Sequence, residues 1–238
     1  MGQTARAALK KIARLADPRR AIASRWFFKT GKGEYGEGDK FLGVNNPTLR
    51  LLSRDFQGLP LVEIKKLLRN SFHEIRQLGL FILVRQFERS SEPEKKRIYD
   101  FYLGHTDAIN NWDLVDCSAH KIIGAYLWQR DKKILYKLAR SKNLWERRIA
   151  IISTFYFIKN KKSSVALDIA RILRSDKEDI IRKAVGWMLR EIGKNCGQGV
   201  EEKFLQKYYA ELPRVTLRYA IERFPKPKIR AYLLGNFR

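Results

Sequence analysis

The chain has 238 residues, of which 45% are hydrophobic, so it is long enough and apolar enough to bury a core and is not a disordered chain. Its 49 Lys and Arg against 25 Asp and Glu give a formal net charge of +24, which indicates a polyanionic partner because phosphate neutralisation releases counterions. No apolar run is long enough to cross a bilayer, and two isolated Cys with three His cannot form an ordinary zinc site. We therefore expect no membrane span, no metal and no other cofactor.

Apolar residues recur with helical periodicity along the whole chain, and no alternating strand pattern is present. The basic first sixteen residues resemble a mitochondrial presequence, but their apolar face favours an ordinary first helix. Asn46 before Pro47 is expected to cap a helix, and Ser91 three residues before Glu94 has the spacing of a capping box. The predicted helices span residues 3–16, 19–28, 47–56, 60–69, 72–88, 94–103, 108–128, 131–140, 144–159, 164–174, 178–193, 200–210, 214–223 and 226–234.

The segment from Thr30 to Gly43 interrupts this pattern and contains five glycines. It lacks the Gly-Lys-Ser/Thr ending of a nucleotide-binding P-loop. One interpretation is a long loop between helices whose glycines adopt positive φ. The other is a loop that lets a DNA backbone approach closely, with contacts from Lys32, Tyr35 and Lys40. No low-complexity linker follows, so residues 1–238 are predicted to form one domain.

Short similar segments recur along the chain. They begin at Arg76, Arg147 and Arg182, about 71 and about 35 residues apart, which is a period of helical-pair repeats. One period after Arg76 lies the segment around Trp112. The pattern predicts an all-α fold, an α-α superhelix (solenoid) of about six helical-pair repeats.

Equivalent positions of stacked repeats lie along one continuous surface. This surface is expected to carry Trp112, Asp116, Arg148 and Trp187. Each alone has an ordinary explanation, since a tryptophan on a repeat helix is usually a packing residue and a lone aspartate is usually solvated or paired with a nearby base. Together, two indoles and a carboxylate form a site suited to a cation, which is out of place on a basic surface unless the target nucleotide is itself cationic.

Asp113 is a second candidate, beside Asp116, for the carboxylate that acts together with Trp112. Trp112 and Asp116 are spaced i, i+4 and therefore share one helix face. Asp113 lies about 100° away around the helix from Asp116. We therefore expect Asp113 to contact a neighbouring helix instead.

The sequence resembles the AlkD-type DNA alkylation repair glycosylases over nearly its whole length. The resemblance is carried by Gly33–Asp39 with Phe41–Val44, Trp112–Asp116, Trp145–Arg148, Lys183–Glu191 and Pro213–Ile221. It implies a solenoid of HEAT-like repeats that wraps duplex DNA. It also implies hydrolysis of the N-glycosidic bond of cationic N3- or N7-alkylated purines, without extrusion of the damaged base.

The resemblance also implies the roles of individual residues. Trp112, Asp116 and Trp187 would form the catalytic set, with Asp116 stabilising positive charge on the sugar. The implied DNA contacts come from Arg148, Arg147, Arg190, Arg214 and Lys183. No lysine lies in a nucleophile motif, so we expect simple hydrolysis without strand cleavage.

The expected partner is double-stranded DNA containing alkylated purines. We expect a monomer in the bacterial or archaeal cytoplasm, associated with the nucleoid. Two alternatives remain open. One is a non-catalytic helical-repeat DNA-binding relative, and the other is a repeat scaffold for RNA or acidic partners.

Overall fold

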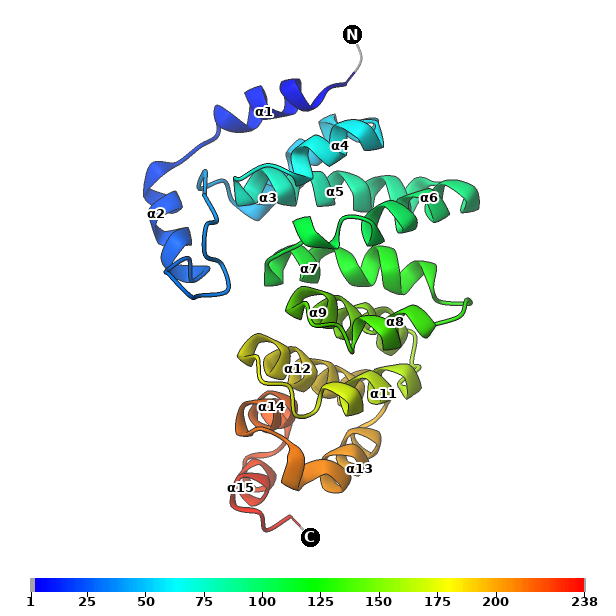
Figure 1. Ribbon diagram of the computed structural model, residues 1–238. Coiled ribbons are helices and arrows are strands. Elements are labelled where there is room, and N and C mark those ends of the chain that lie inside the picture. Colours follow the sequence, from blue (N-terminus) through cyan, green and yellow to red (C-terminus); the bar gives the residue numbers. More distant parts are fainter. Residues whose placement is uncertain (1–2, 238) are drawn as a thin grey trace. The chain divides into compact units, whose positions relative to one another are not determined.

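The computed structural model describes residues 3–237 and contains helices but no strand among them (Figure 1). The chain forms two compact units that divide between Ile122 and Ile123, with the π-helical turn η2 (His120–Gly124) at the boundary. This helical architecture confirms the predicted all-α class.

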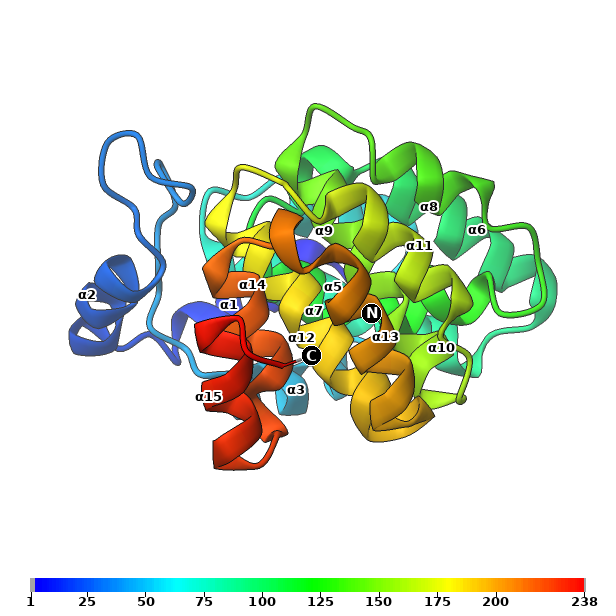
Figure 2. The same ribbon diagram turned by 90° about the horizontal axis from the view of Figure 1, so that it is seen from below.

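In the first unit, α5 is the central helix. It packs against α3, α4 and α7, and most of its residues are buried. The elements of this unit are α1 (Ala5–Ala13), α2 (Pro18–Phe27), α3 (Asn46–Asp55), α4 (Leu61–Leu68), α5 (His73–Arg89), α6 (Glu92–Leu103), the 3-10 turn η1 (Thr106–Ala108) and α7 (Trp112–Ala119). Figures 1 and 2 both place α2 at the margin of the unit, away from α5.

In the second unit, α12 has the corresponding central place and packs against α9, α11, α13 and α14. Its apolar residues Ile181, Ala184, Met188 and Ile192, which recur with helical spacing, are all buried. The elements are α8 (Lys133–Leu138), α9 (Leu144–Ser153), α10 (Phe155–Lys159), α11 (Ser164–Leu173), α12 (Asp179–Cys196), α13 (Gln198–Tyr208), η3 (Tyr209–Glu211), α14 (Arg214–Ala220), η4 (Ile221–Arg223) and α15 (Lys226–Leu234). Consecutive helices pack in pairs, α8 with α9 and α11 with α12, as helical-pair repeats do.

Capping residues set the helix starts. The Ser91–Glu94 capping box is present, as predicted. The cap expected at Asn46 is wrong by one residue, because the Oδ1 of Asn45 accepts from the Thr48 N–H and Asn46 is already helical.

Two long predicted helices are interrupted. In the 108–128 segment, residues 109–111 are not helical, α7 begins only at Trp112, and the π turn η2 follows it. The 144–159 segment divides at Thr154, where the hydroxyls of Ser153 and Thr154 donate to carbonyls of the preceding turn at 2.6 Å. Such bonds compete with the regular ladder and bend helices.

Candidate functional site

The first unit carries the predicted pair Trp112 and Asp116 on α7. Trp112 is the first residue of this helix, and its backbone N–H donates to the Asn111 Oδ1 at 2.8 Å. Asp116 follows one turn later, and both side chains are half-buried. The i, i+4 spacing therefore places an indole and a carboxylate on one accessible face of α7.

Aromatic rings from the end of α2 pack on the Trp112 indole. Phe28 stacks on it with ring centroids 5.4 Å apart and planes 23° apart, and Phe27 meets it edge-on at 5.8 Å. Phe28 also stacks on Phe41 at 5.1 Å and lies 4.8 Å from the His73 ring. The indole is thus held by Phe27 and Phe28, and Phe28 in turn packs on Phe41 of the glycine-rich segment.

Asp113 faces α5, as the sequence predicted. Its Oδ2 is 2.9 Å from the His73 Nε2 and accepts from the Gln77 Nε2 at 2.9 Å. Asp113 is buried and is therefore a structural carboxylate that joins α7 to α5. Asp116 is the more accessible of the two.

A second carboxylate, Asp39, joins the glycine-rich segment to the same helices. It accepts from the Arg76 Nη2 at 2.6 Å and from the Asn111 Nδ2 at 3.1 Å, and its Oδ2 is 3.3 Å from the His73 Nδ1. Because Asn111 also caps α7, these bonds connect Asp39 to the backbone that carries Trp112. We call Asp39, His73, Asp113 and Arg76 the buried charge cluster.

The imidazole of His73 is 1% exposed between the two carboxylates. Burial by itself lowers the pKa of His73, but the charge of Asp113 and hydrogen bonds to Asp113 and Asp39 outweigh it and raise the pKa to about 9. At neutral pH His73 is therefore an imidazolium that donates from both nitrogens. It links the glycine-rich segment, α5 and α7 at one point.

The glycine-rich segment is a loop whose glycines at 33, 38 and 43 have positive φ, which confirms the first interpretation. Lys32 and Lys40 have exposed side chains and Tyr35 is half-buried. The backbone of Lys40 is anchored by bonds from its N–H to Ser71 and from the His73 N–H to its carbonyl. The DNA contacts expected from these side chains stay predictions.

The second unit carries Trp187 on α12 and Arg148 on α9. Trp187 is half-buried, with the Phe155 ring 5.7 Å away and tilted by 48°. Arg148 is 6% exposed, and its Nη1 donates to the Ile180 carbonyl within the same unit. The structure thus places this arginine against α12, whereas the repeat alignment predicts that it lies on the repeat surface with Trp112 and Trp187.

The other arginines and the lysine expected to bind DNA have partners within the second unit. The Arg147 guanidinium forms an ion pair with Asp176, with its Nε 2.7 Å from Oδ2. Arg190 pairs with Glu222. Lys183 pairs with Asp179 at 2.6 Å, and the exposed Arg214 donates to the Leu233 carbonyl. Lys183 and Arg214 retain accessible surface for a phosphate.

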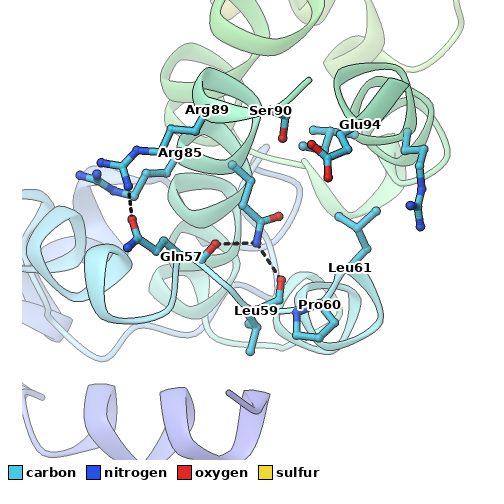
Figure 3. A pocket seen from close by; sticks show the side chains of 11 residues that line it. Gln57, Leu59, Pro60, Leu61, Arg85, Arg89, Ser90 and Glu94 are labelled. Atoms are coloured by element: carbon cyan, nitrogen blue, oxygen red, sulfur yellow. Dashed lines mark hydrogen bonds between the residues drawn. The ribbon is translucent and has the colours of Figure 1, made fainter. Parts of the chain in front are cut away.

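A separate pocket lies at the other end of α5 and is lined by Arg85, Arg89 and Gln57 (Figure 3). Arg89 donates to the Gln57 side chain, and Gln86 donates to the Leu59 carbonyl at 2.7 Å. Since Arg85 lies 12 residues after His73 on α5, about 18 Å of helix separates this pocket from His73. It is therefore not part of the Trp112 and Asp116 site.

Within residues 3–237, His, Cys, Asp and Glu side chains form no group of three or more that could hold a metal ion. Over the same residues, no helix has the length and hydropathy of a membrane span.

The sequence did not single out the residues that hold Trp112 in place, namely Phe27, Phe28, Asp39, His73 and Asn111. The one usable signal was local: asparagine is a good cap, but the predicted helix 108–128 has Asn111 in its interior and so misses it. The contacts of Asp39 with His73 and Asn111 join residues that are 34 and 72 positions apart, so no local sequence pattern predicts them.

Comparisons with known proteins agree with this architecture. The chain matches the family described as DNA alkylation repair enzyme over residues 8–224. A solved structure described as a predicted DNA alkylation repair enzyme from Enterococcus faecalis is similar, with 19% identity and a TM-score of 0.68. The similarity covers 89% of this chain and 97% of that one, and at this identity it concerns the fold alone. No curated protein matches the chain. Because the family match spans most of the sequence, the chain belongs to the DNA alkylation repair enzymes, and DNA is its partner.

Proposed function

We propose that the protein is a monofunctional DNA glycosylase that releases N3- and N7-alkylated purines from duplex DNA. The observation that carries this proposal is the pair on α7, where Trp112 and Asp116 lie one turn apart and half-buried. The net charge of +24 supports duplex binding, and the indole–carboxylate pair supports recognition of positive charge.

An N3- or N7-alkylated purine carries a formal positive charge. When the C1′–N9 bond breaks, its electron pair neutralises the purine, so the leaving base needs no general acid. Positive charge moves to the sugar and gives a transition state that resembles an oxocarbenium ion. Water then forms the new bond to C1′ and loses a proton.

Asp116 is assigned two tasks in this reaction. Its carboxylate stabilises the positive charge on the sugar and accepts the proton from the attacking water. Electrostatic stabilisation of this kind is worth about 3 kcal/mol when a single donor or charge is removed. Asp113 is not available for this role because it is buried and bonded to His73 and Gln77.

Trp112 is assigned the cation-binding face. An indole face attracts positive charge by about 0.5–2 kcal/mol, and more where water is excluded. Phe27 and Phe28 fix the orientation of this ring in advance, so it need not reorganise during the reaction. The family resemblance adds Trp187 to the same aromatic role.

Some of the side chains proposed to contact DNA are exposed, and others are engaged in ion pairs within the protein. Lys32, Lys40 and Arg214 have exposed side chains and are proposed to contact phosphates. Arg147 and Arg190 are engaged in ion pairs, so a phosphate would have to compete with Asp176 or Glu222.

The test uses duplex DNA carrying a single 7-methylguanine. The wild-type protein should release the free base and leave an abasic site in an intact strand. The nucleotide is proposed to stay stacked, so 2-aminopurine placed beside the lesion should show little increase in fluorescence on binding. Tight duplex binding with no base release would instead favour a non-catalytic DNA-binding relative.

A further inference from the structure

Helix α2 exposes large apolar side chains to solvent. None of its residues is buried. Trp26 is 86% exposed, and Ile22, one turn earlier on the same face, is also exposed. Exposed large apolar groups that lie together mark interaction sites in soluble proteins.

The same segment is strongly basic. Residues 18–29 contain Arg19, Arg20, Arg25 and Lys29, all exposed, and no acidic residue. Arg20 pairs with Asp17, the residue that caps the helix, and the other three have no ion pair among the described residues. An apolar ring set among cations complements a nucleic acid, in which phosphates flank sugars and bases.

Although no residue of α2 is buried, both ends of the helix are anchored. The Asp17 N–H donates to the Leu42 carbonyl at 2.8 Å, and the Phe28 ring at the C-cap packs between Phe41 and Trp112. Gly43 lies so close to Asp17 that an added Cβ would be 2.1 Å from its carbonyl oxygen. The exposed face is therefore held in place before any partner binds.

Helix α2 lies next to the proposed lesion site, which favours DNA as the partner of its exposed face. Phe27, the neighbour of Trp26, contacts the Trp112 indole at 5.8 Å. A duplex whose damaged nucleotide lies at Trp112 therefore passes close to α2.

We propose that α2 is a DNA-binding helix whose Trp26 ring packs against the sugars and base edges of the strand beside the lesion, while Arg19 and Arg25 contact its phosphates. This assignment rests on the proposed function, because it takes Trp112 as the position of the lesion. Apolar side chains inserted at base steps are a common device of proteins that hold a distorted duplex.

The test compares Trp26→Ala with Val62→Ser, a change at a 63% exposed residue of α4 in the same unit. Loss of one aromatic contact with a base weakens binding by about 5-fold to 100-fold. Trp26→Ala should therefore bind an undamaged duplex at least fivefold more weakly than wild type, and Trp26→Phe should recover most of the affinity. Val62→Ser should bind like wild type. Equal thermal midpoints of all variants will show that folding is unchanged.

Direct contact is measured by fluorescence. Emission of the wild type minus that of Trp26→Phe isolates the exposed indole, and it should be quenched when the duplex is added. Arg19→Ala and Arg25→Ala should each lower the slope of log affinity against log salt by about one.

Two results would overturn the proposal. One is duplex affinity in Trp26→Ala equal to that of Val62→Ser, with no quenching of the isolated indole. The other is a blue shift of that indole on vesicles of anionic phospholipid with no response to DNA, which would make α2 a membrane-surface helix. Release of 7-methylguanine by the wild type is scored separately, so failure of the glycosylase proposal is distinguished from failure at α2.

Discussion

Loss of the His73 proton should make the first unit markedly less stable in alkali. The imidazole is 1% exposed and lies between Asp113 and Asp39, with Arg76 also bonded to Asp39. The perturbation is a rise in pH through the range in which this group loses its proton. The reference is His73→Gln, which has no proton to lose in this range.

The magnitude follows from the pKa. The folded pKa is about 9 and the unfolded value is 6.5, so the folded state binds the proton more tightly. The resulting contribution is fully present below pH 6.5 and is lost as the pH rises to 9. It amounts to about 3 kcal/mol, at 1.36 kcal/mol per pKa unit.

The assay is urea unfolding at pH 6, 7.5 and 9.5 for the wild type and His73→Gln. The difference in unfolding free energy between the two proteins should shrink by about 3 kcal/mol across this range. Side-chain NMR of the three histidines should show one, His73, that titrates near pH 9. The reasoning is refuted when His73 titrates near 6.5, or when the difference between the two proteins is independent of pH.

Other parts of the chain give further predictions. Gly43→Ala should lower stability by at least about 2 kcal/mol, because φ is +81° and the new Cβ would meet Asp17. Gly33→Ala, at φ +78° in open space, should cost only about 1 kcal/mol, and equal thermal midpoints of the two variants would contradict the clash. Burial, reinforced by the Glu202 charge, raises the pKa of Glu201 to about 8, so ionising it costs stability as the pH rises from 4.5 to 8. The unfolding free energy of Glu201→Gln minus that of wild type should therefore rise by about 5 kcal/mol between pH 4.5 and pH 9 in urea unfolding, whereas identical pH profiles would contradict this reading.

The helices were predictable because each depends on its own sequence. The periodic apolar pattern was enough to locate α5 and α12 to within a few residues, although neither helix begins at a side-chain cap. Interruptions were not predictable, since the break at Thr154 depends on hydroxyl groups that bond to the backbone instead of to solvent.

The candidate site was predictable in part. Spacing alone identified Trp112 and Asp116 as neighbours and separated Asp113 from them. The residues that hold this pair in place were not predictable, because Phe28 reaches Trp112 from the C-cap of α2 and Asp39 comes from a loop whose path depends on distant contacts with α5 and α7. The repeat alignment also could not show that Arg148 is buried against the Ile180 carbonyl.

The most direct test of the central claim is the single-turnover rate of 7-methylguanine release by Asp116→Asn. The matched control is Asp107→Asn, a change at an exposed aspartate of η1 in the same unit. Asp116→Asn should release the base at least tenfold more slowly than wild type, and about a hundredfold more slowly if the full value of about 3 kcal/mol of charge stabilisation is lost, with affinity for the intact duplex nearly unchanged because that stabilisation acts only in the transition state. Asp107→Asn should match the wild type. Equal release by Asp116→Asn and Asp107→Asn, or a parallel loss of release and duplex affinity in Asp116→Asn, would contradict a catalytic role for this carboxylate.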